Sequence, residues 1–227
     1  DPLRPIRAIV ENGLADAVIF NQTRPRDARV AWLMQRGFPF ATHGRTVWAD
    51  RHPWADFDNA AFGAIAVRRL VARGRAGLAL LAPPLDQNYA RDFVRGASEA
   101  AAQAGAALRV LPRVTSDSPG PAMQAAVARA LGRGLDGLVC ASSSAAMAAV
   151  AAVEAEGLAV GRQVDVVAKE AIPFLSLFRR DLIVLHEDVA RAGTVLAQAA
   201  IRAIREPQAP PLQDLEVPTD EEEREGA

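Results

Sequence analysis

Polar side chains that could hold a small molecule follow several short apolar runs of this sequence. The stretch at 54–59 reads WADFDN and brings two aromatic side chains and two carboxylates together just before a helical pattern. Asp58 and Asn59 are both good helix N-cap residues. The stretch is therefore either an ordinary strand-to-helix junction or a crossover between two lobes, which would carry Phe57 to a ligand-binding cleft.

The residues that commonly carry catalysis lack their usual spacing. There is no Walker loop, no strand-linked G-x-G-x-x-G motif and no G-x-S-x-G motif. The Ser142–Ser144 triplet has no base beside it in the sequence, so helix capping is the favoured role. The adjacent Lys169 and Glu170 are expected to be solvated or to face a ligand as an ion pair. The histidines share no metal-ligand spacing with one another: His43, His52 and His186. A binding protein with neither metal nor cofactor is favoured over an enzyme.

The composition is that of an ordinary globular protein. The chain has 227 residues, half of them hydrophobic, and a net charge of −1, which allows one large domain or two modest lobes. This charge argues against a general nucleic-acid-binding surface, because phosphate neutralisation needs clustered Lys and Arg. The single cysteine, Cys140, is interpreted as a buried thiol. No run is apolar enough to span a membrane and no signal peptide is visible, so we expect no membrane partner.

Short Val- and Leu-rich segments alternate with helical patterns along the chain. Such alternation predicts parallel sheets covered on both faces by helices, which is an α/β fold. Strands are predicted at 17–20, 38–41, 78–81, 107–111, 138–140, 164–167, 182–185 and 215–217, and the stretch at 54–59 is expected to contain a short extended piece. Ligands of such sheets bind beyond the carboxyl ends of the strands. Those ends carry Asn21 and the residues at 43–45, 83–89, 142–144 and 169–170.

Several blocks of sequence match a known family in their order and spacing. They are DAVIF at 16–20, DFDN at 56–59, LVARGRAGLALL at 70–81, YARDFVRG at 89–96, AEGLAVG at 155–161 and VDVV at 164–167. Together they resemble the effector-binding core of LacI/GalR-type transcriptional regulators, with Arg75 where the family usually has His. The segments at 38–45 and 166–169 resemble a subgroup associated with α-glucosides and raffinose-type sugars.

The resemblance implies two Rossmann-like lobes with parallel sheets, joined by three crossovers as in the periplasmic-binding-protein type I fold. The implied N-terminal lobe spans 1–57 and is completed by 187–206. The C-terminal lobe spans 58–180 and is completed by 213–218, and 219–227 forms a disordered acidic tail. The crossovers are expected near Phe57, at 172–180 and at 207–212.

Two parts of the family pattern are absent from this sequence. The family begins with a helix-turn-helix DNA-binding domain, followed by a strand-helix-strand unit that starts the first lobe. A sheet without its first strand exposes backbone groups that need partners. We therefore expect both parts upstream, outside this chain.

The resemblance also implies an effector site between the lobes. Polar side chains there would bond to adjacent hydroxyl groups, and Phe57 and Tyr89 would stack on the apolar face of a sugar. The effector-facing candidates are Asn21, Arg45, Phe57, Gln87, Tyr89, Phe93, Ser142 and Glu170. Phe93 replaces the arginine of many sugar-binding members and could instead pack in the core. Arg45 could instead form a surface salt bridge, and Lys169-Glu170 replaces an acidic pair.

The implied function is that of the effector-sensing and dimerisation core of a bacterial LacI-type transcriptional regulator. Such a protein would be a cytoplasmic homodimer that represses carbohydrate genes, and a small sugar would switch its binding to operator DNA. A sugar-binding receptor of a transport or signalling system, with the same fold, is the alternative. An α/β enzyme is a third class, which no residue pattern supports.

Overall fold

The chain forms two compact α/β units in a computed structural model that describes residues 2–219. Unit 1 contains residues 2–57, 86–89 and 188–216, and unit 2 contains 58–85, 90–187 and 217–219. The predicted disordered tail lies outside the described residues from position 220 onward. No helix of the described part is long and apolar enough to cross a membrane.

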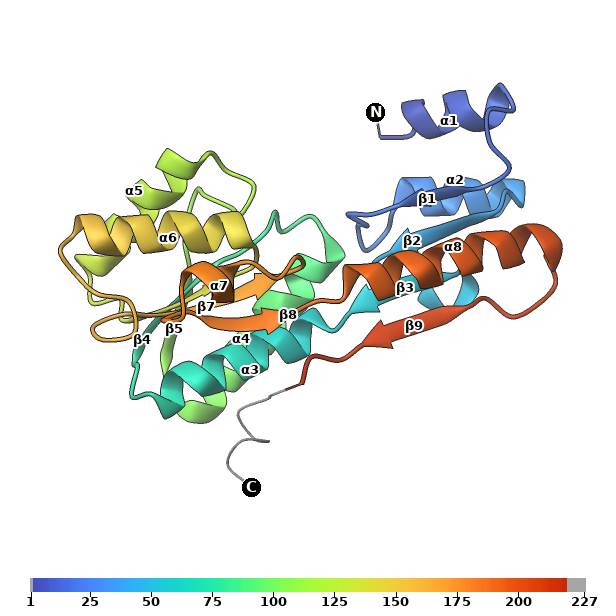
Figure 1. Cartoon of the computed structure of the whole chain (residues 1–227). Coiled ribbons are helices and arrows are strands. Elements are labelled where there is room, and N and C mark those ends of the chain that lie inside the picture. The colour runs from blue at the N-terminus through green and yellow to red at the C-terminus, as the bar shows by residue number, and fades with distance from the viewer. Residues whose placement is uncertain (1, 220–227) are drawn as a thin grey trace. The chain divides into compact units, whose positions relative to one another are not determined.

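Unit 1 is built on a four-stranded sheet in which all paired strands are parallel. Its strand order is β1-β2-β3-β9 (Figure 1). The elements are α1 (Arg4–Glu11), β1 (Val18–Phe20), α2 (Ala28–Arg36), β2 (Phe40–His43), the 3₁₀ turn η1 (Ala49–Arg51), β3 (Trp54–Phe57), α8 (Val189–Arg205) and β9 (Gln213–Glu216).

Helices pack against both faces of the unit 1 sheet. Neighbouring residues of a strand point to opposite faces, and β2 shows this directly. Phe40 packs with Val30 and Leu33 of α2 and with Ile6 of α1. Its neighbour Ala41 packs with residues of α8 on the opposite face. The central strand β2 is therefore buried from both sides, as the sequence pattern predicts, whereas the edge strands β1 and β9 have no buried residue.

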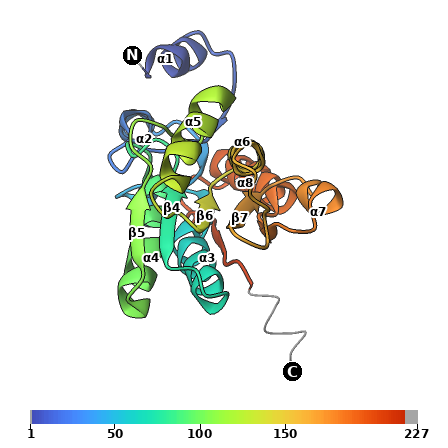
Figure 2. The same ribbon diagram turned by 90° about the vertical axis from the view of Figure 1, so that its left-hand side faces the viewer.

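Unit 2 contains a five-stranded parallel sheet with the order β5-β4-β6-β7-β8. Figure 2 shows β5, β4, β6 and β7 in this order across the sheet. The elements are α3 (Asn59–Ala72), β4 (Gly77–Leu81), α4 (Asn88–Ala104), β5 (Ala107–Val110), α5 (Gly120–Leu131), β6 (Gly137–Cys140), α6 (Ser143–Ala155), β7 (Asp165–Glu170), α7 (Leu175–Phe178) and β8 (Ile183–His186).

The unit 2 sheet separates two pairs of helices, with α5 and α6 on one face and α3 and α4 on the other (Figure 1). Gly96 of α4 lies against the backbone of Ala60 in α3, where a Cβ atom would collide with the carbonyl group. A glycine here lets the two helices approach closely. Cys140 is fully buried, and burial raises the pKa of its thiol, so the interpretation as a buried thiol is confirmed.

Two of the three crossovers lie later in the chain than predicted. The first follows Phe57 as expected, but the second lies at Glu187–Asp188 rather than at 172–180, and the third lies at Glu216–Val217 rather than at 207–212. The assignment of 213–218 to the C-terminal lobe is wrong for β9, because β9 pairs with β3 of unit 1. This pairing joins segments that are far apart in the sequence, so local patterns could not reveal it.

Candidate functional site

The carboxyl edge of the unit 1 sheet brings together three of the predicted effector-facing residues. Asn21 follows β1, Arg45 lies just after β2, and Phe57 ends β3. Because these strands are parallel and adjacent, their carboxyl ends share one edge of the sheet. Asn21 is exposed, Arg45 is partly exposed, and Phe57 is buried. These positions are the ones at which a parallel sheet usually holds a ligand.

Arg45 is held in place from several directions. Its Nε lies 2.7 Å from Oδ2 of Asp56, whose side chain is 5% exposed. The backbone carbonyl of Arg45 accepts a hydrogen bond of 2.9 Å from Oγ1 of Thr23, and its guanidinium lies 5.7 Å from the centre of the Trp54 ring. Arg45 therefore does form the salt bridge that was the alternative to a ligand contact, although its carboxylate partner is buried rather than at the surface; a ligand contact in addition stays a prediction. A fixed guanidinium suits the recognition of a polar ligand.

Asp56 has an altered acidity because of its position. Burial raises the pKa of this carboxyl group, and the hydrogen bond and positive charge of Arg45 counteract that effect only in part. The Arg45 guanidinium is therefore the main group that opposes the effect of burial on the pKa of Asp56, beside the candidate site.

Gly44 is required by the turn that delivers Arg45. Its φ of +110° is a backbone conformation that L side chains rarely adopt. A Cβ atom at this position would also come within 2.6 Å of Oγ1 of Thr23, the group that holds the backbone of Arg45. Any larger residue at 44 would therefore disturb the position of Arg45.

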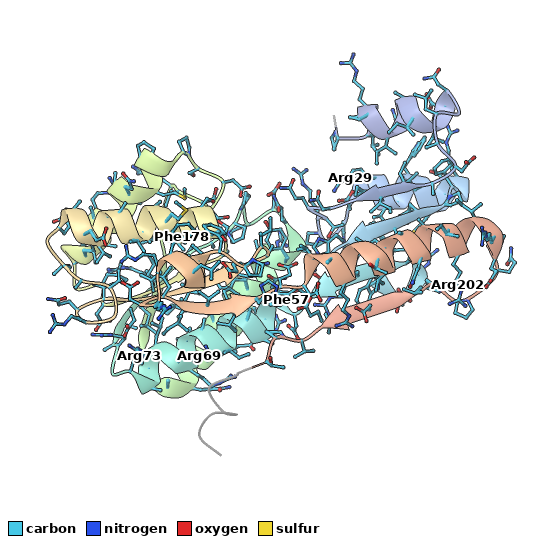
Figure 3. All side chains as sticks on the ribbon, in the orientation of Figure 1. Arg29, Phe57, Arg69, Arg73, Phe178 and Arg202 are labelled. Carbon is cyan, nitrogen blue, oxygen red and sulfur yellow. The ribbon has the colours of Figure 1, made fainter. Side chains whose placement is uncertain are left out.

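Arg29 shapes the loop that carries Asn21. Its Nη2 donates hydrogen bonds to the backbone carbonyls of Asn21 (3.1 Å) and Gln22 (3.0 Å). The same guanidinium pairs with Asp27, the N-cap residue of α2, and lies 4.5 Å from the centre of the Phe20 ring. Figure 3 shows Arg29 projecting from α2 beside this loop. The role of Arg29 was not predicted from the sequence.

Gln87 and Tyr89 lie in the segment 86–89, which belongs to unit 1 although the chain on either side of it, 58–85 and 90–187, belongs to unit 2. Tyr89 is the second residue of α4. The N–H of Asn88 donates to the carbonyl of Thr23 at 2.8 Å, and Asp86 pairs with Arg24 at 2.7 Å. Gln87 is buried, and its Oε1 has no hydrogen-bond partner within residues 2–219. A buried acceptor of this kind is costly unless a donor reaches it.

Unit 2 presents Ser142 at the carboxyl end of β6. Its hydroxyl accepts a hydrogen bond from the N–H of Ala145 at 3.2 Å and caps α6, as the sequence predicts. The same oxygen lies 3.1 Å from Oγ of Ser144. Ser142 is only partly buried, so a ligand contact in addition to capping stays a prediction.

Glu170 has a structural role that the sequence did not reveal. It is buried, and its Oε2 accepts hydrogen bonds from the N–H groups of Phe174 (3.3 Å) and Leu175 (2.9 Å) at the start of α7. The carboxylate therefore supports the loop after β7. A contact with an effector through its other oxygen stays a prediction.

The expected ion pair between Lys169 and Glu170 is wrong, because Lys169 pairs with Glu187 instead. The Lys169 Nζ lies 2.7 Å from Oε2 of Glu187 and 3.2 Å from Oδ1 of Asn59. Successive residues of a strand point to opposite faces, so Lys169 and Glu170 diverge. Glu187 follows β8, the neighbour of β7. This polar cluster at the carboxyl edge of unit 2 was missed, because its members come from three separate segments.

Phe93 packs in the interior of unit 2. It has no exposed surface, and its ring stacks on that of Phe62 with 5.4 Å between centroids. These contacts favour the packing alternative that the sequence had left open for this residue. Among residues 2–219, no group of three or more His, Cys, Asp or Glu side chains is arranged to hold a metal ion.

Two α/β units, each with a parallel sheet and polar residues at its carboxyl edge, define a periplasmic-binding-protein-like domain. The sequence model of the family described as "Periplasmic binding protein-like domain" matches residues 67–225. The chain belongs to this family.

Relatives with known names are transcriptional regulators, which confirms the LacI-type resemblance. The chain is 27% identical over 217 residues to the HTH-type transcriptional regulator AglR of Rhizobium meliloti (strain 1021), covering 92% of this chain and 60% of AglR. It is 35% identical over 81 residues to the HTH-type transcriptional regulator RafR of Escherichia coli, covering 36% of this chain and 24% of RafR. The solved complex of the transcriptional regulator CelR with cellobiose has a TM-score of 0.82 and 20% identity, covering 95% of this chain and 67% of CelR.

Proposed function

We propose that this chain is the effector-sensing core of a LacI-type transcriptional regulator that responds to a small sugar. The whole protein would act in the cytoplasm as a homodimer and repress carbohydrate genes. DNA binding would reside in a helix-turn-helix domain outside this chain. The similarity to AglR over 92% of the chain supports this role, and AglR itself extends well beyond the matched part.

The buried Oε1 of Gln87 is the observation that carries the proposal. This acceptor has no hydrogen-bond partner within the described residues, and its segment is anchored through Asn88 to Thr23, the residue that also holds Arg45. Sugar hydroxyls donate as well as accept. A hydroxyl bound to Gln87, with a neighbouring hydroxyl on Arg45, would satisfy groups that are already fixed in position.

Ligand sensing requires that the sugar bind one arrangement of the two units more tightly than another. A ligand with equal affinity for both arrangements does not change the equilibrium between them. We propose that the affinity for the sugar depends on this arrangement. Asn21, Arg45, Phe57, Gln87 and Tyr89 are the unit 1 candidates. Ser142 and Glu170 are those of unit 2.

Exposed apolar side chains around α7 support the homodimer. Ile172, Leu177 and Phe178 are 70%, 77% and 78% exposed, and all three belong to one short segment of unit 2. Clustered exposed apolar residues mark interaction surfaces in many soluble proteins. We propose that a second copy of the protein covers them.

The test is a calorimetric titration of the chain with cellobiose and with other mono- and disaccharides. We expect saturable binding of at least one sugar, with affinity reduced about tenfold in Gln87→Met, which keeps the side-chain volume but loses a fixed hydrogen bond. Gln198→Met, at an exposed position of α8 in the same unit, is the matched control and should bind normally. Glu170→Ala is a poor probe, because Glu170 also supports α7.

Absence of saturable binding to every sugar tested would contradict the proposed substrate class. The regulatory part is tested with the full-length protein, by measuring operator affinity with and without the sugar that binds. If the sugar does not change the affinity for the operator, the proposed regulation by the sugar is wrong.

A further inference from the structure

A cavity of about 340 Å³ opens at the amino edge of the unit 1 sheet. It is lined by the residues just before β2, β3 and β9 and by the C-terminal parts of α2 and α8. Because these strands are parallel, this edge is opposite to the one that carries Asn21, Arg45 and Phe57. The cavity lies in the size range of small-molecule sites, roughly 300–1,000 Å³, and none of the candidate effector residues lines it.

The segment that closes one side of this cavity is held in place. Residues 206–212 connect α8 to β9, and three prolines restrict the backbone of this segment. The N–H of Ala209 donates to the carbonyl of Glu206 at 2.9 Å, which closes a turn at the start of the segment. At its other end, the carbonyl of Leu212 accepts a hydrogen bond of 3.1 Å from the N–H of Trp54. The cavity is therefore preformed.

Much of the cavity wall is apolar. Met34, Phe38, Ala203 and Leu212 line it, and all four are only partly buried. Met34 and Phe38 pack against the apolar cluster beneath α2 and keep part of their surface open towards solvent. A flat apolar group in the cavity would remove this surface from water, and an aromatic ring could pack against that of Phe38.

The polar groups of the wall leave one positive charge without a partner. Glu206 is the acidic residue of the wall, and its Oε2 lies 3.3 Å from Nε of Arg202, which Figure 3 labels near the end of α8. His52 is buried, both nitrogens of its ring already have partners within unit 1, and burial lowers its pKa. Arg51 is exposed and forms neither an ion pair nor a side-chain hydrogen bond with any residue of the range 2–219.

We propose that this cavity binds a small carboxylic acid with an aromatic body. The ring lies against the apolar part of the wall, and the carboxylate accepts paired hydrogen bonds from Arg51, whose planar guanidinium matches the two oxygens. A monocarboxylate is favoured over a more highly charged anion, because one unpaired arginine balances one negative charge. The site is separate from the proposed sugar site, and it binds its ligand whether or not the chain senses a sugar.

The test is isothermal titration of the full chain with 2-naphthoate and with its uncharged analogue 2-naphthamide. We expect saturable binding at one site per chain, with the acid bound about tenfold more tightly than the amide. Arg51→Gln should remove this preference, and it should fold normally because Arg51 is exposed, as checked by circular dichroism. Arg205→Gln is the matched control, since it removes the same charge from an exposed position of α8 outside the wall, and it should keep the preference.

A second variant tests the location of the site independently of charge. Ala203→Leu adds three carbon atoms to the apolar part of the wall, and leucine is a good helix former. We expect it to weaken binding of the acid and of the amide alike, by about tenfold or more. No saturable binding by the unaltered chain overturns the proposal. Affinities that Ala203→Leu leaves unchanged overturn it as well, because the probes would then bind elsewhere. A preference for the acid that survives in Arg51→Gln also overturns it, because the carboxylate would then not bind Arg51.

Discussion

Lys169 and Glu187 form an ion pair that is almost closed to solvent. Their charged atoms lie 2.7 Å apart, and their side chains are only 12% and 8% exposed. Removing one partner of such a pair strongly destabilises the folded protein, because the other charge is then left buried without a partner.

Replacing Lys169 alone should therefore destabilise the protein strongly. We expect Lys169→Met to lower the free energy of unfolding by about 3 kcal/mol, because Glu187 would lose its cation. The double variant Lys169→Met/Glu187→Leu should recover most of that loss. Urea unfolding curves measure both effects. Arg95→Met is the control, since Arg95 pairs at the surface and is 55% exposed, and should cost less than about 1 kcal/mol. Equal losses in Lys169→Met and the double variant would contradict this account.

Arg75 should not be replaceable by lysine. Its guanidinium bonds to Asp165 (2.6 Å) and to the backbone carbonyls of Arg162 (2.8 Å) and Gln163 (3.3 Å), and so ties β4 to the start of β7. An ammonium group cannot make these contacts together. We expect Arg75→Lys to cost about 1–2 kcal/mol in thermal or urea unfolding. Arg68→Lys should leave the stability unchanged. An unchanged stability in Arg75→Lys would show that only the positive charge of Arg75 matters for stability.

Two glycine variants separate backbone strain from steric collision. Gly13 and Gly44 both have positive φ, but a Cβ at Gly13 would meet nothing, whereas at Gly44 it would meet Thr23. We expect Gly13→Ala to cost about 1 kcal/mol and Gly44→Ala about 2–3 kcal/mol. Gly44→Ala should also weaken binding of any sugar found by titration. Equal stability losses and unchanged affinity would contradict the importance of this turn.

A charge placed on α7 should weaken the proposed homodimer. We expect Phe178→Asp to shift the protein towards monomer in sedimentation velocity, because a carboxylate cannot be buried unpaired in an apolar interface. Leu14→Asp is a matched control, since Leu14 is 70% exposed in unit 1. A dimer unaffected by Phe178→Asp would show that the contact lies elsewhere.

Lowering the pH should remove the contribution of ionised Asp27 to the stability of the folded protein. Burial favours its neutral form, but hydrogen bonds from Arg29 and from backbone N–H groups outweigh this and lower the pKa. The pKa is thus lower in the folded state than in the unfolded state. The added stability is complete above the unfolded value of about 4 and is lost as the pH falls through the folded value. The stability difference between the unaltered chain and Asp27→Asn should therefore be largest near neutral pH and shrink in acid. A constant difference in urea midpoint across this range would contradict the coupling.

Local patterns were sufficient to predict the fold class and the helix starts. Asp58 and Ser142 each cap a helix, as their sequence context predicted, because capping depends on residues only two or three positions apart. The carboxyl edges could be predicted too, because parallel strands align their ends.

Contacts between distant segments were not accessible from the sequence. The partner of Lys169 depends on the pairing of β7 with β8, and the place of β9 depends on its pairing with β3. Phe93 illustrates a different limit. An aromatic residue on a helix face has the same pattern whether it packs against Phe62 or against a ligand, and only the fold decides between them.

Unit 1 is formed by segments that are far apart in the sequence, and this affects how it folds while the protein is being synthesised. A ribosome produces all strands of unit 2 before residue 187, whereas the unit 1 sheet waits for β9, near the end of the chain. Until then, the edge of β3 from Trp54 to Phe57 has no strand to pair with and is open to other chains. Newly made protein should therefore be most prone to aggregation during this interval. A chaperone that shields the β3 edge would protect it until synthesis is complete.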